Sequence, residues 1–273
     1  MADPANRRLG LAGAPSIRGR TGEDGGEGEP PRLARITHVT LYEKVYEELR
    51  DALMSGRFLP GETLTFRGVA DALGTSVMPV REALRRLAAE RAVQFQADRS
   101  IRVPLLDEQS FDELLQMRLL LEGRAAALAA QCMTLSDFVE ARAFNLAFAD
   151  PPGDGAPTAR LLANHQFHFA IYRAARSPLL LSLIEMMWLQ SGPYLMAPMR
   201  WRAARSEASS YFDTGVVHHR ELLDALTRRD ASAAASAVQA DIRDAAEAYR
   251  DALAAHEVDS DPAQTSVTFD REN

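Results

Sequence analysis

The sequence predicts a mainly α-helical protein: an N-terminal winged helix-turn-helix with a small β-hairpin wing, followed by an antiparallel α-helical bundle. Three observations predict this architecture. A short helical pattern ends at Gly74 and leads directly into an arginine-rich helical pattern. A segment of alternating apolar residues follows that pair. Beyond residue 107 the chain shows helical patterns separated by turn residues.

The N-terminal domain opens with a helix that begins at Thr40. Thr40 and Glu43 form the pattern of a capping box, and Gly56 can end the helix in a left-handed conformation. Thr65 caps a second, shorter helix. Gly74 supplies the turn into the third helix, and a helix presented in this way can enter the major groove of DNA.

Residues 92–103 have the pattern of a two-stranded hairpin. Val93 and Phe95 lie on one arm, while Ile101 and Val103 alternate with a polar residue on the other. Three helices and a two-stranded wing make a winged helix.

The rest of the chain predicts a bundle, with six helical patterns over residues 107–131, 136–149, 158–175, 178–199, 209–227 and 230–255. Both ends of the chain lack the apolar surface that would offset the entropy of ordering. We therefore expect a disordered tail (1–36), a winged-helix domain (37–104), a helical domain (105–257) and a second disordered tail (258–273).

Charge and composition restrict the class of protein. The 273 residues carry a net charge of −7, yet residues 36–104 carry +1 and residues 105–273 carry −9, so the acidic balance lies outside the winged helix. No apolar run reaches the roughly 18 residues that a membrane-spanning helix needs, so we expect no membrane partner. The single cysteine, Cys132, excludes an intramolecular disulfide framework and fits a cytoplasmic protein.

Two motifs carry a resemblance to a known family. Residues 55–64 read Ser-Gly-Arg-Phe-Leu-Pro-Gly-Glu-Thr-Leu, and residues 79–84 read Pro-Val-Arg-Glu-Ala-Leu. With these two blocks at the family's separation, residues 41–104 resemble the DNA-binding domain of GntR-type bacterial transcription regulators. The resemblance implies a winged helix that binds double-stranded DNA.

In that family, an arginine early in the second helix and another in the recognition helix grip DNA. These positions fall on Arg67 and Arg81. The family usually has Arg-Thr where this chain has Val77 and Met78, so we expect an altered operator preference; the two side chains could contact thymine methyl groups or pack on backbone sugars. The full set of expected DNA contacts is Arg67, Thr75, Ser76, Val77, Met78, Arg81, Arg99 and Ser100.

Several polar residues lie on inward faces of the bundle helices. At about 100° per residue, His219 falls on the apolar stripe of its helix, and His218 is not expected to point inward. His168 shares a face with Asn164, and Asp241 lies on a stripe of small apolar residues, where a carboxylate needs a partner. Two imidazoles and a carboxylate that converge inside a bundle could bind a divalent metal.

Motifs in three of these helices resemble the FadR branch of the GntR family, whose all-helical (FCD-like) domain binds a small effector and forms the dimer. Many relatives of that domain hold a metal with Asp, His, His and His. The matching positions here are Asn164, His168, His219 and Asp241, which implies a zinc or nickel site with two altered ligands. The alternative is a hydrogen-bonded polar cluster in which Asp241 accepts protons from the histidines.

Arg118 and Glu122 lie one turn apart in the first helix of the bundle. They could form an internal salt bridge. They could instead belong to the effector site, with Arg118 binding the carboxylate of an organic acid that also ligates the metal.

Together these features predict a homodimeric, ligand-responsive transcription regulator, most often a repressor in this family, on a pseudo-palindromic operator. One alternative is a metal-dependent bundle enzyme built on His168, His219 and Asp241, although the sequence offers these residues no accompanying nucleophile or acid-base pair. The other is a DNA-binding protein whose helical domain only dimerises.

Overall fold

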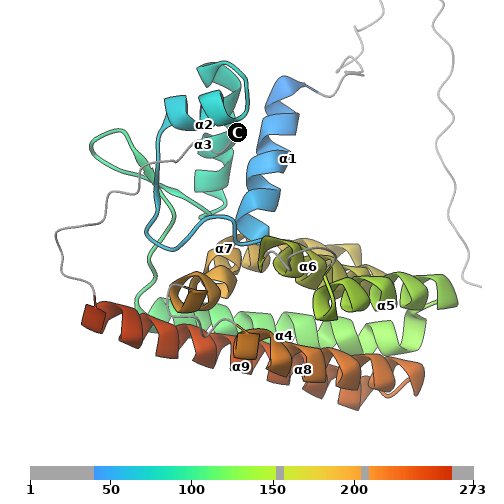
Figure 1. Cartoon of the computed structure of the whole chain (residues 1–273). Helices are drawn as coiled ribbons and strands as arrows, with labels where there is room; N and C mark the ends of the chain where they lie inside the picture. Colours follow the sequence, from blue (N-terminus) through green and yellow to red (C-terminus); the bar gives the residue numbers. More distant parts are fainter. Residues whose placement is uncertain (1–39, 152–156, 204–208, 260–273) are drawn as a thin grey trace, which may run out of the picture. The chain divides into compact units, whose positions relative to one another are not determined.

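The computed structural model describes residues 40–151, 157–203 and 209–259. In these segments the chain forms a winged helix and then a helical bundle (Figure 1). The predicted tails lie outside the described residues, except that the last helix continues past residue 257 to Asp259.

Three helices build the winged helix: α1 (Leu41–Met54), α2 (Phe66–Ala72) and α3 (Val77–Ala89). The predicted helix starts are confirmed, because Thr40 and Glu43 form a capping box on α1 and Thr65 caps α2. Gly56 (φ 66°) follows α1 and Gly74 (φ 62°) lies in the turn before α3, both in the left-handed region that favours glycine.

The wing is an antiparallel sheet with the strand order β1-β3-β2, built from β1 (Thr63–Leu64), β2 (Gln94–Phe95) and β3 (Ile101–Arg102). The predicted hairpin of β2 and β3 is confirmed. The strand β1, which was not predicted, adds a third strand to its sheet. A strand of two residues is too short to show alternation. Its place in the sheet is visible only through pairing, as in Leu64 opposite Ile101.

The recognition helix α3 buries one face and exposes another. Val80, Ala83, Leu84 and Leu87 are 0% exposed and recur at intervals of three or four residues, as one face of a helix requires. Met78 lies on the other side and is 61% exposed. Burial of the first face fixes α3 in the domain and leaves the second face to solvent.

All six predicted bundle helices are present, with small shifts at their ends: α4 (Glu108–Cys132), α5 (Leu135–Ala149), α6 (Pro157–Ala174), α7 (Pro178–Ala203), α8 (Ser209–Thr227) and α9 (Ala231–Asp259). Helix α9 packs along α4, α7 and α8, and α5 packs along α6 (Figure 1). None of the described helices is both long enough and apolar enough to cross a bilayer.

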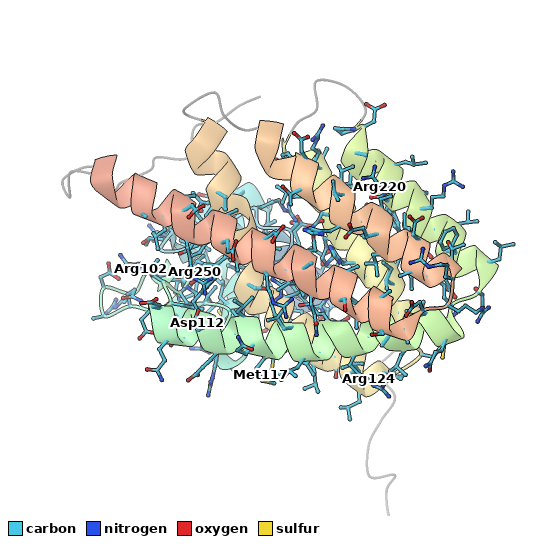
Figure 2. The ribbon with its side chains drawn as sticks, turned by 90° about the horizontal axis from the view of Figure 1, so that it is seen from below. Arg102, Asp112, Met117, Arg124, Arg220 and Arg250 are labelled. Atoms are coloured by element: carbon cyan, nitrogen blue, oxygen red, sulfur yellow. The ribbon has the colours of Figure 1, made fainter. Side chains whose placement is uncertain are left out.

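Helices α4 and α9 are joined by polar contacts as well as by packing. Gln239 on α9 donates from its side-chain amide to the Leu119 carbonyl at 3.0 Å. Gly123 leaves room for this contact, since a Cβ there would lie 2.6 Å from the Gln239 amide nitrogen. Nearer the other end of the pair, Arg250 and Asp112 form an ion pair (Figure 2).

The burial of α3 generates a stability prediction. Leu84→Ala should lower the free energy of unfolding by about 2–5 kcal/mol, because it removes a fully buried side chain and leaves a cavity. The exposed Met78→Ala is the matched control and should change it by less than about 0.5 kcal/mol. Chemical denaturation of the two variants measures both values, and equal losses would contradict the assigned faces of α3.

Candidate functional site

The expected DNA-contacting residues lie in α2, in the turn and first part of α3, and at the wing tip. Arg67, Ser76, Met78 and Arg99 are exposed. Thr75, Val77, Arg81 and Ser100 are half-buried. The predicted set is thus divided between side chains that project into solvent and side chains that are partly held by the domain.

Arg81 is held by an aromatic pair that sequence reasoning missed. Its guanidinium carbon lies 4.6 Å from the centroid of the Phe66 ring, and Phe66 stacks on Phe95 of the wing with ring centroids 6.1 Å apart. This stack fixes the direction of the Arg81 side chain between the helices and the wing. The available signal was the aromatic residue directly before Arg67.

The two unusual residues at the start of α3 differ in environment. Val77 packs against the hydrophobic core, whereas Met78 projects into solvent. Ser76 occupies the N-cap position, but its side chain makes no capping hydrogen bond. The hydroxyl of Ser76 and the thioether of Met78 are therefore the groups of this segment that can reach another molecule.

The wing tip is a tight turn that presents Arg99. Arg99 has a φ of 70°, and Ser100 donates both its N–H and its hydroxyl to Asp98 at 2.9 and 2.6 Å. These hydrogen bonds lower the pKa of Asp98. The turn is thereby ordered from within, and the Arg99 side chain remains exposed.

Not every arginine of α3 is available for binding. The Arg86 guanidinium donates to Glu90 at 3.0 Å and lies 3.8 Å from the centroid of the Tyr46 ring. Tyr46 in turn donates its hydroxyl to Glu90 at 2.8 Å. Arg86 therefore joins α3 to α1 and has a structural role.

The bundle contains a cavity of about 330 Å³. Its aromatic wall includes Phe148, Trp188 and Phe212. Its polar wall comes from four helices and consists of Arg118, Asn164, His168, His218, Asp241, Asp244, Glu247 and Asp251. A cavity of this size, with an aromatic wall and convergent polar groups, has the features of a small-molecule site.

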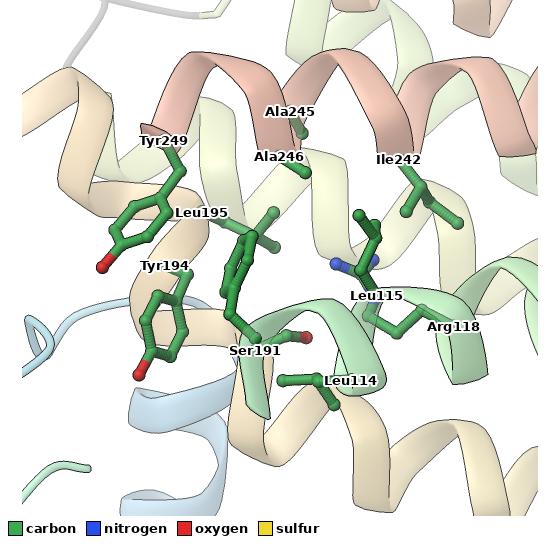
Figure 3. A pocket seen from close by; sticks show the side chains of 11 residues that line it. Leu114, Leu115, Arg118, Ser191, Tyr194, Leu195, Ile242, Ala245, Ala246 and Tyr249 are labelled. Carbon is green, nitrogen blue, oxygen red and sulfur yellow. The ribbon is translucent and has the colours of Figure 1, made fainter. Parts of the chain in front are cut away.

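Arg118 lines this cavity and also a smaller one of about 20 Å³ (Figure 3). The predicted internal salt bridge is present, with Arg118 Nε donating to Glu122 Oε1 at 2.6 Å. Burial opposes the charge on Arg118, but Glu122 more than compensates and raises the pKa of the guanidinium. Arg118 is thus a fixed cation at the wall of both cavities.

Glu122 lies behind Arg118 and is not among the residues that line either cavity. It is fully buried, and its Oε2 accepts hydrogen bonds from the Tyr172 hydroxyl at 2.5 Å and from Trp188 Nε1 at 2.8 Å. Any contribution of Glu122 to the cavity is therefore made through Arg118, whose position it determines.

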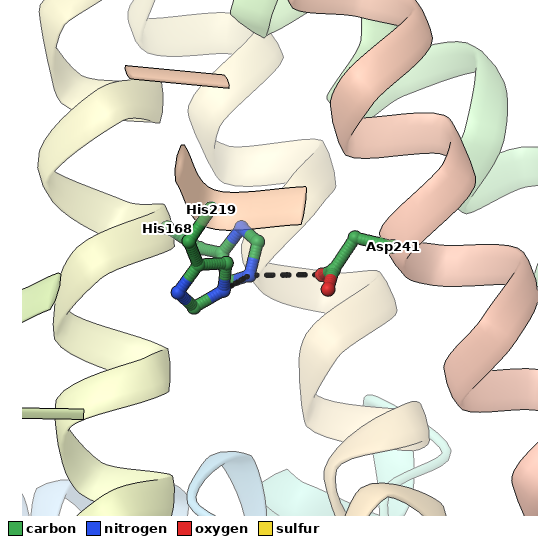
Figure 4. A group of neighbouring side chains, drawn as sticks. All are labelled: His168, His219 and Asp241. Atoms are coloured by element: carbon green, nitrogen blue, oxygen red, sulfur yellow. Dashed lines mark hydrogen bonds and ion pairs between the residues drawn. The ribbon is translucent and has the colours of Figure 1, made fainter. Parts of the chain in front are cut away.

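His168, His219 and Asp241 come together as predicted (Figure 4). His168 Nε2 lies 3.3 Å from His219 Nε2 and 3.2 Å from a carboxylate oxygen of Asp241. One potential ligand atom from each residue lies within 4.8 Å of the other two. The three residues come from α6, α8 and α9, so the packing of three helices creates the cluster.

The hydrogen bonds around the cluster determine the tautomers of both histidines. Tyr172 gives its only hydroxyl proton to Glu122, so the contact of 3.2 Å with His168 Nδ1 requires Nδ1 to be the donor. Asn145 presents its carbonyl oxygen to His219 Nδ1 at 3.0 Å, which makes that nitrogen a donor as well. In a neutral His219 ring Nε2 then carries a lone pair, whereas His168 Nε2 carries one only when no proton lies between it and the Asp241 carboxylate.

Burial and contacts within the cluster shift the pKa values of His219 and Asp241. Burial lowers the pKa of His219 to about 3, so its ring is neutral at pH 7. Burial would raise the pKa of Asp241, but the contact with His168 outweighs it and the pKa is lowered. Two imidazoles and a carboxylate converge here, which is a donor set that suits a divalent cation.

Two neighbours of the cluster differ from the sequence-based expectation. His218 was not expected to point inward, and this was wrong: its side chain lines the cavity and Nε2 lies 2.7 Å from Asp244. Burial alone would lower the pKa of His218, but the carboxylates of Asp244 and Asp241 raise it. The sequence-based expectation considered only the apolar stripe of this helix, whereas α9 also covers the face of α8 that carries His218.

Asn164 and Asn145 have different positions in the site. Asn164, which was predicted as a fourth ligand, lines the cavity together with His168 and Asp241. Asn145, which was not predicted, contacts His219 from α5. No signal in the sequence distinguished Asn145 from other polar residues of its helix.

Comparisons with known proteins agree with this architecture. The model of the family described as bacterial regulatory proteins, gntR family, matches residues 41–103, and the FCD domain model matches residues 113–244. The HTH-type transcriptional regulator McbR of Escherichia coli is 32% identical over 165 residues, which cover 60% of this chain and 75% of that protein. The chain belongs to the GntR family.

A solved structure and one further relative support the same assignment. The solved structure of E. coli McbR/YncC has a TM-score of 0.67 and 26% identity, and the match covers 81% of this chain and 99% of that one. A probable D-xylose utilization operon transcriptional repressor of Paenarthrobacter nicotinovorans is 29% identical, over 72% of this chain and 83% of that protein. This GntR protein is accordingly a DNA-binding transcription regulator and not an enzyme.

The buried salt bridge generates a second stability prediction. Glu122→Gln removes the negative charge and leaves the Arg118 guanidinium buried without a counter-charge, so the free energy of unfolding should fall by about 3–5 kcal/mol. The control is Glu140→Gln, which removes one partner of the exposed Glu140–Arg173 pair and should cost less than about 1 kcal/mol. Comparable losses in the two variants would show that Glu122 is not the counter-ion of a buried charge.

Proposed function

We propose that this regulator is a cytoplasmic homodimeric repressor that binds a pseudo-palindromic operator and responds to a small organic acid bound in the bundle together with a divalent metal. The observation that carries the proposal is that a buried arginine, Arg118, and two members of the metal-ligand cluster, His168 and Asp241, line one cavity. A ligand that bridges them would contact α4, α6, α8 and α9, and could therefore change the packing of the bundle.

The metal would be held by His168, His219 and Asp241. Two imidazole nitrogens and one carboxylate oxygen suit zinc or nickel. The tautomers support this proposal, since in the neutral cluster no hydrogen lies between the two Nε2 atoms, and a proton or a cation is needed to join them. A bound cation would supply a fixed positive charge that attracts an anionic effector.

Asn164 and the second coordination sphere complete the proposed site. Asn164 offers a neutral amide oxygen from the same helix as His168 and is the candidate for a fourth, weaker ligand. Tyr172 and Asn145 orient the two imidazoles through their Nδ1 atoms. Such outer contacts increase metal affinity because they fix the ring and its tautomer.

The charges of the cavity restrict the effector. Arg118 and a bound cation would attract a carboxylate, and Glu122 already balances one positive charge. The α9 wall carries the acidic side chains Asp244, Glu247 and Asp251. We therefore propose an effector with a carboxylate at one end and a hydrogen-bond donor, such as a hydroxyl or an amine, at the other.

DNA binding follows from the winged helix. Arg67 and Arg81 would contact the DNA from α2 and α3, Ser76 and Met78 from the start of α3, and Arg99 from the wing. A dimer with two-fold symmetry presents two such surfaces, which fits two half-sites in opposite orientation.

The metal proposal predicts a loss of bound metal when one ligand is removed. Wild-type protein purified without chelators should contain zinc or nickel. His168→Ala should contain less than about a tenth as much, because even the loss of an outer contact to a ligand lowers metal affinity by about 10–100-fold. Metal content per chain measured by mass spectrometry checks this. His165→Gln is the matched control, because His165 lies on the same helix but outside the cluster.

The same measurement of metal content distinguishes a metal held by this cluster from a metal held elsewhere. Equal metal in the wild type and in His168→Ala would contradict this site. Full occupancy in His165→Gln together with loss in His168→Ala would separate the cluster from a general effect of histidine removal.

The DNA proposal predicts a large effect from Arg81. Arg81→Ala should weaken binding to the protein's own promoter by at least about tenfold, because a charged contact held in place by Phe66 is lost. Wild-type affinity should also fall steeply with salt. Fluorescence anisotropy with promoter and random duplexes measures both effects.

Arg142→Ala is the control for charge, since Arg142 is exposed on α5 of the bundle. It should leave promoter binding unchanged. Promoter affinity in Arg81→Ala equal to that of the wild type would reject the assigned DNA surface.

A further inference from the structure

One tyrosine holds the segment that joins the winged helix to the bundle. The Tyr194 hydroxyl donates to the Pro104 carbonyl at 3.0 Å and accepts from the Leu106 N–H at 2.9 Å. Tyr194 lies on α7 and is 3% exposed, and its ring packs against Phe111 and Tyr249. A single hydroxyl thus binds the backbone on both sides of Leu105, between β3 and α4.

The same turn of α7 touches α1 backbone to backbone at Gly192. A Cβ at Gly192 would lie 2.1 Å from the Leu53 carbonyl oxygen and 2.8 Å from that of Met54, so only glycine fits. Leu53 and Met54 belong to the last turn of α1 and are each 1% exposed. Two turns earlier on α7, Glu185 forms an ion pair with Arg50 of α1 at 2.9 Å.

The same turn of α7 faces the smaller cavity. Ser191 is 4% exposed, and its hydroxyl makes no hydrogen bond within the described part of the chain. It lines the cavity of about 20 Å³ together with Arg118 (Figure 3), and that volume is enough for one water molecule. Arg118 also lines the larger cavity, as do Leu195, Ile242 and Ala245, so the two cavities share a wall that includes the guanidinium.

Helix α7 is weakened at this point. Pro193 lies inside the helix and has no N–H, so it cannot donate the backbone hydrogen bond to the carbonyl four residues earlier. Helices bend preferentially at such positions. Residues 191–194 are therefore the part of α7 where a small change at Arg118 can alter the helix.

We propose that Tyr194 is a positioning residue that sets the place of the winged helix on the bundle, and that residues 191–194 of α7 transmit the state of the effector cavity to it. The transmission rests on the proposed function of that cavity, whereas the positioning does not. A shift of this turn moves the Tyr194 hydroxyl and the Gly192 contact together, and hence two of the attachments of the winged helix.

The test measures the position of the winged helix directly. Spin labels at Glu47→Cys on α1 and Ser136→Cys on α5, both exposed sites, report the distance between the domains in full-length protein with Cys132→Ser. An excess of unlabelled chain restricts the signal to pairs within one chain. Pulsed electron–electron double resonance gives the distribution of distances between the two labels, with and without zinc.

Tyr194→Phe should broaden this distribution or add a second distance, because the loss of a hydrogen bond shifts such a population by about fivefold. The ring remains, so the aromatic cluster is retained. The control Tyr249→Phe removes a hydroxyl from the neighbouring ring of that cluster and should leave the distribution as in the wild type. Gly192→Ala should displace the distance further, if that variant folds.

The outcomes separate this inference from the proposed function. A distribution in Tyr194→Phe identical to that of the wild type overturns the positioning role, whatever zinc does. Zinc binding by calorimetry is measured on the same samples, and a wild type that binds no zinc overturns the metal site but not the positioning role. A zinc-induced change that is present in the wild type and absent in Tyr194→Phe, at unchanged zinc affinity, supports transmission; the same change in both overturns it.

Discussion

The bundle is organised around one buried carboxylate. Glu122 accepts hydrogen bonds from Arg118 on α4, Tyr172 on α6 and Trp188 on α7, and it is fully shielded from water. A carboxylate without these partners would be too costly to bury. With them it holds Arg118 at the cavity wall and, through Tyr172, determines the tautomer of His168. The position of the Arg118 guanidinium and the tautomer of His168 therefore both depend on Glu122.

The sequence predicted local structure well because local signals were strong. The ends of the winged-helix helices were predicted from Thr40, Thr65 and Gly74. Apolar periodicity predicted all six helices of the bundle. It missed β1, whose existence depends on pairing with residues nearly forty positions later. Contacts of this kind leave no local pattern.

The candidate site was predictable to the extent that its residues lie on inward helix faces. His168, His219 and Asp241 were found in this way, but His218 was assigned to the wrong environment because it meets α9 and not the apolar stripe of α8. Asn145 and Phe66 were missed because each acts on another side chain: Asn145 orients His219, and Phe66 supports Arg81. Such supporting roles depend on tertiary packing.

The extra strand has a mechanical consequence. β1 follows the turn after α1 and pairs with β3, and Gly61 and Glu62 exchange backbone hydrogen bonds with Val103 directly beside it. The wing is thus fastened at its base to the segment between α1 and α2, so it cannot swing independently of the recognition helix. The winged helix therefore behaves as one rigid body. In the proposed dimer, a change in the bundle would alter the spacing of the two winged helices without changing how either one fits its half-site.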